Sequence, residues 1–208
     1  MLIRRRETLD RTLDLAKTGL LLGLAMWISL IAINNATDPA TNTALLQQTV
    51  TMDALQANSE MGNGLEWRAW PASLATPMLV GVIVVQSTIA LLLWRAAVMF
   101  ELRTLRTSFR DSNSRAPTKE ITAANVALGA FMSLWFFFLC GGLYFGYWIE
   151  LGAIQGVHMT LLMVTLLSFF LINYQSPATN LETREHSRGG ERLRNRAVVA
   201  SGEERRDR

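Results

Sequence analysis

Four apolar blocks, each close to the length of a membrane span, divide this chain of 208 residues. They cover residues 15–33, 72–94, 124–145 and 157–172. A helix needs roughly 20 apolar residues to cross a hydrocarbon core of about 30 Å. A soluble helix would carry polar residues along one face, and none of these blocks does. The sequence therefore predicts an all-α membrane protein with four transmembrane helices.

Basic residues are distributed unevenly around these blocks. Of the 20 Lys and Arg residues, all except Arg68 precede the first block or lie at its start, separate the second from the third, or follow the fourth. Cytoplasmic segments of membrane proteins carry an excess of Lys and Arg, so we expect both termini to be cytoplasmic (N-in/C-in) in a bacterial inner membrane. Basic residues beside spans favour contact with anionic lipids over nucleic acid.

Two regions follow from this arrangement. Residues 1–174 form the expected four-span transmembrane domain, and residues 175–208 form an Arg-rich cytoplasmic tail. The tail is polar and poor in aromatic residues, so it cannot bury a core of its own.

Residues 40–71 form the one longer external loop, and within it residues 43–57 have the composition of a short interfacial helix. Trp67 and Trp70 flank Arg68 just before the second span, where amphipathic aromatic side chains anchor helix ends at the headgroup level. One hypothesis makes Arg68 a loop clamp that pairs with Asp38 or Asp53. The alternative is that Arg68 binds an anionic lipid headgroup.

Polar and small residues within the spans indicate faces that pack against another helix or a partner protein. Polar side chains avoid hydrocarbon, and glycines allow close backbone approach. The candidate packing residues are Gln86, Ser87, Thr88, Trp135, Gly141, Gly142 and Trp148.

His158 is the one histidine within a span, and His186 lies in the tail. A bis-histidine haem within one chain needs two facing imidazoles, so this pattern excludes it. His158 is either a hydrogen-bonded packing residue or a group that contacts a quinone or relays protons. The single cysteine, Cys140, excludes an internal disulfide, and no Gly-rich phosphate loop or catalytic triad motif is present. We expect no catalytic residue, metal or intrinsic cofactor, and we expect bound phospholipids.

Short motifs resemble the bacterial family of predicted small integral membrane proteins, domain of unknown function 2165. They are Asn34-Asn35-Ala36-Thr37-Asp38, Val50-Thr51-Met52-Asp53, Trp67-Arg68-Ala69, and Gly141-Gly142 with Trp148. The resemblance covers residues 1–173 and implies a multi-span fold with no assigned activity. The family pattern has an acidic residue after the glycine pair, where this chain has Leu143, so a role of that carboxylate is not carried over.

Three functional hypotheses follow. The first is a non-catalytic accessory subunit of a larger membrane complex, most plausibly a respiratory or photosynthetic one. The second is a transporter or channel component that works through Gln86, Ser87 and Thr88. The third is a quinone-interacting protein that uses His158.

Overall fold

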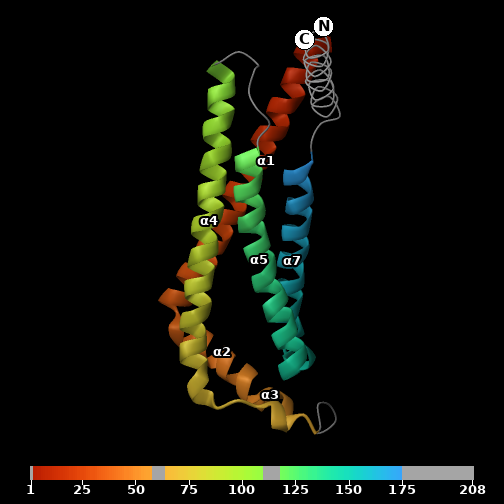
Figure 1. Cartoon of the computed structure of the whole chain (residues 1–208). Helices are drawn as coiled ribbons and strands as arrows, with labels where there is room; N and C mark the ends of the chain where they lie inside the picture. Colours follow the sequence, from red (N-terminus) through yellow and green to blue (C-terminus); the bar gives the residue numbers. More distant parts are fainter. Residues whose placement is uncertain (1, 58–63, 110–117, 175–208) are drawn as a thin grey trace, which may run out of the picture. The chain divides into compact units, whose positions relative to one another are not determined.

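The computed structural model describes residues 2–57, 64–109 and 118–174 of the chain. These residues belong to two compact units. The larger unit, Arg11–Asn173, is the helical bundle described below (Figure 1). Of the other unit, the described part is the helical segment 2–10 together with Tyr174. The predicted tail, 175–208, lies outside the described residues.

Four long helices make up the bundle, as the apolar blocks predict. They are α1 (Leu2–Thr37), α4 (Ala75–Phe109), α5 (Thr118–Phe145) and α7 (Gly152–Asn173). Each contains an apolar segment of 22 to 34 residues, which is long enough to cross a membrane. The all-α prediction with four transmembrane helices is therefore confirmed. Helix α4 continues well beyond its apolar block, as the helical spacing of its charged residues indicates.

Short helices connect α1 to α4. They are α2 (Pro39–Thr51), α3 (Asp53–Gln56), and the 3-10 turns η1 (Glu66–Arg68) and η2 (Ala72–Leu74). Asp38 begins α2, because its Oδ1 accepts a hydrogen bond from the Thr41 amide at 3.3 Å and Pro39 cannot continue α1. The predicted helix over residues 43–57 thus begins earlier. It also breaks at Met52, whose φ of 59° ends α2.

Helices α5 and α7 form an antiparallel hairpin, joined through the short helix α6 (Tyr147–Glu150) (Figure 1). Gly146 separates α5 from α6 with a φ of 67°, a left-handed conformation that suits glycine. This sharp reversal places Tyr147 directly beside the end of α5.

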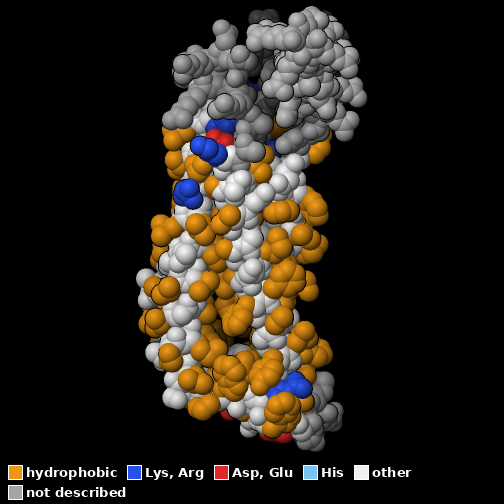
Figure 2. Space-filling model, viewed as in Figure 1, with side chains coloured by type: hydrophobic (Ala, Val, Ile, Leu, Met, Phe, Trp, Pro, Cys, Tyr) orange, Lys and Arg blue, Asp and Glu red, His pale blue; other side chains and the backbone are white. Residues whose placement is uncertain are grey.

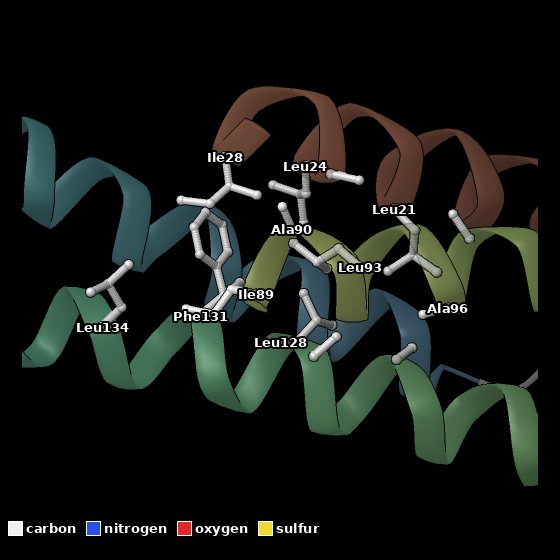
Figure 3. Close-up of a cluster of buried hydrophobic side chains, with 14 of the residues drawn as sticks. Leu21, Leu24, Ile28, Ile89, Ala90, Leu93, Ala96, Leu128, Phe131 and Leu134 are labelled. Atoms are coloured by element: carbon white, nitrogen blue, oxygen red, sulfur yellow. The ribbon is translucent and has the colours of Figure 1, made fainter. Parts of the chain in front are cut away.

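The main core lies where α1, α4, α5 and α7 meet, and Figure 3 shows part of it. Leu21 and Leu24 of α1 lie over Leu93 of α4, and Ile28 of α1 lies over Phe131 of α5. Small residues let α4 and α5 approach closely, which matters because lipid supplies no hydrophobic drive for helix association. The buried alanines of this core are Ala25, Ala90, Ala96, Ala97, Ala124 and Ala127.

A second cluster holds the loop helices against the end of α5. Val50, Met52 and Leu55 pack with Phe145, and all four are buried. Outside both clusters, large apolar side chains remain exposed along the long helices (Figure 2). Such a surface suits contact with lipid rather than water.

Replacing Gly146 with alanine tests the α5–α6 reversal. The new Cβ would lie 2.9 Å from Leu55 Cδ2, and the left-handed backbone would itself cost about 1–2 kcal/mol. We therefore expect Gly146→Ala to lower the thermal stability of the protein in detergent. Gly152→Ala is the matched control because its Cβ would meet nothing within 4 Å. Equal melting temperatures for the two variants would contradict this account.

Candidate functional site

A cavity of about 990 Å³ lies within the bundle. Residues of α1, α2, α4, α5 and α7 line it, together with Tyr147 of α6. Its walls are mainly aliphatic and aromatic. Val84 of α4 and Phe137 of α5 line the cavity and are 58% and 63% exposed, so the cavity reaches the surface of the bundle. Because both residues belong to membrane-crossing segments, the opening faces the region that lipid would occupy.

One polar pair at the cavity joins α1 to α4. Asn35 Nδ2 donates to Gln86 Oε1 at 2.8 Å, and Gln86 is only 2% exposed. Away from water an amide side chain needs a protein partner, so this bond satisfies part of the polarity of both residues. Asn35 therefore does more than end a helix, and α1 continues past it to Thr37.

The predicted polar patch on α4 divides between two environments. Gln86 points inward to Asn35, whereas Ser87 and Thr88 are exposed. Thr88 lies at the cavity and donates its hydroxyl to the Val84 carbonyl at 2.8 Å, a bond within its own helix. Only Gln86 makes the interhelical hydrogen bond that the patch was expected to provide.

A second polar group joins α6 to α7 at the cavity. Tyr147 Oη lies 2.9 Å from the Phe138 carbonyl oxygen and 2.9 Å from His158 Nδ1. A phenol has one proton, and the carbonyl can only accept, so Tyr147 donates to Phe138 and accepts from the Nδ1–H of His158. Burial raises the pKa of Tyr147 to about 12, so the phenol keeps its proton at neutral pH.

Aromatic rings of α5 surround His158. Its ring stacks on Phe138 with centroids 4.9 Å apart and on Trp135 at 5.7 Å. Trp135 and Phe138 are themselves 5.7 Å apart, so both lie against one side of the imidazole. Trp135 is 2% exposed, and its Nε1–H has no hydrogen-bond partner among the described residues. The structure thus brings His158 and Trp135 together, two residues that the sequence treats separately.

Sequence reasoning missed Tyr147 as a site residue. The available signal was its position just after α5 and the short connection to α7, which place Tyr147 and His158 at the same end of one hairpin. Nothing in the sequence indicated which side of each helix these two side chains occupy.

The glycine pair of α5 has two different surroundings. A Cβ on Gly142 would lie 2.9 Å from Tyr147 Cζ and would collide with Gln155, so glycine gives Tyr147 its place. A Cβ on Gly141 would meet nothing within 4 Å. Trp148, expected at a packing face, is 50% exposed.

Arg68 binds the end of α5. Its Nη1 donates to the Tyr144 carbonyl at 3.2 Å, and its guanidinium lies 5.2 Å from the Trp67 ring and 5.8 Å from the Tyr144 ring. The last carbonyls of a helix lack intrahelical donors and carry partial negative charge, which favours a cation there. Trp70 packs edge-on against Tyr144 and Phe145.

The expected pairing of Arg68 with Asp38 or Asp53 is corrected by this geometry. Asp38 accepts from Thr41 at the start of α2, and Asp53 lies in the first turn of α3. Between these described residues no ion pair with Arg68 is found, because the guanidinium is directed to the end of α5. Sequence spacing could not reveal a carbonyl partner 76 residues away.

Comparison with known proteins gives one family. The model of a predicted small integral membrane protein, domain of unknown function 2165, matches residues 13–175. This match covers most of the chain, including both polar groups at the cavity, and confirms the resemblance inferred from the short motifs. No curated protein matches the chain, and no solved structure does.

Gly142→Ala should displace Tyr147 and so disturb its bonds to Phe138 and His158. Because Trp135 packs against His158, we expect a changed near-ultraviolet circular dichroism spectrum and a lower melting temperature. Gly141→Ala is the control, since its Cβ occupies open space on the same helix. A spectrum unchanged in both variants would show that Tyr147 does not depend on Gly142.

Arg68→Ala should loosen the segment around η1, because it removes the bond to Tyr144 and the stacking on Trp67. We expect a loss of about 1 kcal/mol and faster chymotryptic cleavage after Trp67. Arg68→Lys keeps the charge but not the planar group, so its cleavage rate should lie between those of the wild type and Arg68→Ala. Arg11→Ala at an exposed position serves as the control. Unchanged cleavage in Arg68→Ala would count against a clamp.

Proposed function

Because the chain belongs to the family of predicted small integral membrane proteins, domain of unknown function 2165, we propose that it is a non-catalytic membrane protein that binds a lipid-like molecule in its cavity. The observation that carries this proposal is the cavity of about 990 Å³, apolar over most of its wall and open at the flank of the bundle. Binding sites for small molecules have this combination of apolar walls and a few polar groups.

The position of the opening favours a ligand that arrives through the membrane. Val84 and Phe137 lie at exposed positions of two different spans, so a molecule dissolved in lipid can enter without passing through water. An acyl or prenyl chain would replace lipid contacts with contacts to the cavity wall. The polar groups Asn35, Gln86 and His158 would then contact the head of the molecule.

We also propose that both termini face the cytoplasm of a bacterial cell and that the protein lies in the inner membrane. The support is the distribution of Lys and Arg, of which only Arg68 falls in the connection between the first two spans. In this orientation α2, α3 and the end of α5 bound to Arg68 lie on the outer side.

The accessory-subunit hypothesis stays a prediction beside this proposal. A subunit of a respiratory or photosynthetic complex would bind partners through the exposed faces of α5 and α6, including Trp148. Stoichiometric co-purification with larger subunits after gentle solubilisation would support it. Because lipid-facing helices expose similar side chains, the surface alone does not favour a subunit.

Filling the cavity tests the proposed function. Gly81 lines the cavity and has open space around its Cβ, so Gly81→Phe should place a ring in the cavity without breaking the helix. We expect mass spectrometry of the purified protein to show at least a severalfold loss of one co-purified lipid-like molecule. Gly129→Phe is the matched control, because Gly129 also has open space but does not line the cavity.

Two results would contradict the proposal. One is the absence of any retained lipid-like molecule in the wild-type protein beyond the general annular lipids of the membrane. The other is equal retention in Gly81→Phe and Gly129→Phe.

A further inference from the structure

The hydrogen-bonded pair of Tyr147 in α6 and His158 in α7 can select among lipid-like molecules, an inference that rests on the proposed function. We infer that the cavity prefers a ligand whose head carries a hydroxyl hydrogen-bond donor, which binds the Nε2 of His158. The chemical class is therefore a hydroxyl-bearing lipid, such as a prenylated hydroquinone or a long-chain alcohol.

The first step is the position of the proton on His158. Tyr147 donates its single phenolic proton in a hydrogen bond to the Phe138 carbonyl oxygen, 2.9 Å away. The phenol oxygen can therefore only accept a hydrogen bond from His158. His158 must then carry a proton on Nδ1. In the neutral imidazole this leaves Nε2 with a lone pair, so Nε2 is an acceptor.

The second step is the surroundings of that lone pair. Nδ1 is bound to Tyr147, and Phe138 and Trp135 occupy one side of the ring. His158 lines the cavity, and Nε2 lies on the ring edge that Tyr147 does not occupy. The hydrogen bond of His158 to the described residues is made by Nδ1, so Nε2 is left to a molecule in the cavity, where lipid could not pair with it.

The third step is the ligand that complements this acceptor. A hydroxyl group can donate one hydrogen bond to Nε2. A quinone carbonyl or an ester oxygen is itself an acceptor, so it forms no hydrogen bond with Nε2. The aliphatic walls suit a hydrocarbon tail. Trp135, whose indole N–H is buried without a partner in the described structure, adds an aromatic surface beside the histidine. The oxidised and reduced forms of one ring system should therefore bind unequally.

Titrating the full-length protein in detergent with decylhydroquinone and with its oxidised form, decylquinone, tests this selection by calorimetry under reducing and oxidising conditions respectively. We expect the hydroquinone to bind about tenfold more tightly, the value of one net hydrogen bond. Decanol and its methyl ether form the second pair of probes, and a phosphatidylcholine without hydroxyl groups is a further control. Decanol should bind better than its methyl ether, and phosphatidylcholine should show no dependence on His158.

Two variants assign the effect. His158→Phe keeps a ring for stacking on Phe138 and Trp135 but has no acceptor, so the preference for the hydroquinone should disappear. Tyr147→Phe frees Nδ1, so His158 can place its proton on Nε2, and the preference should fall towards unity while both probes still bind. A preference that persists in both variants would overturn the inference.

The failure of this inference differs from the failure of the proposed function. If hydroquinone, quinone, decanol and its ether all bind with equal affinity and Gly81→Phe abolishes their binding, the cavity is a lipid site without hydroxyl selection. If none of the four probes binds, the inference fails, and the proposed function fails with it only if the wild-type protein also retains no lipid-like molecule. Tight binding of the hydroquinone with no binding of decanol supports the inference and indicates that the ligand is an aromatic alcohol. Equal binding of the hydroquinone and decanol supports the inference and indicates that the hydroxyl group is sufficient for recognition.

Discussion

Lipid cannot donate or accept hydrogen bonds, and this constraint shapes every part of the bundle. Backbone groups in the four long helices are satisfied within each helix. Several polar side chains within the spans bond to one another or to their own helix, as Asn35 does with Gln86 and as Thr165 does with the Leu161 carbonyl. At the helix ends, where carbonyls lose their intrahelical donors, Arg68 supplies a donor from a distant segment.

The cavity results from the same constraint combined with close helix packing. Alanines bring α4 and α5 together in the main core, which also includes side chains of α1, while the loop helices cover the end of α5 through Val50, Met52 and Leu55. The space between these two clusters is lined by apolar side chains and contains two polar pairs. A site that is apolar, laterally open and locally polar suits an amphipathic molecule from the membrane.

Each polar pair links residues that the sequence keeps apart or treats as unrelated. The sequence places Gln86 in a polar patch with Ser87 and Thr88, but of these three residues only Gln86 forms a hydrogen bond to another helix. Arg68 reads as a partner for nearby acids, yet it binds a carbonyl of α5. His158 reads as an isolated histidine, and its significance depends on Tyr147, which the sequence places only at the same end of the hairpin.

Hydropathy, block length and turn residues by themselves determined the number of membrane-crossing helices, their approximate positions in the chain and the short connection between α5 and α7. These properties follow from local composition, because a segment of about 20 apolar residues can satisfy its backbone in lipid only as a helix. Only the tertiary structure decided the rotation of each helix about its axis, and with it the cavity, the Asn35–Gln86 pair and the proton position on His158. Rotation depends on packing between helices. The sequence of a span with no polar face does not indicate which side of the helix faces its neighbours.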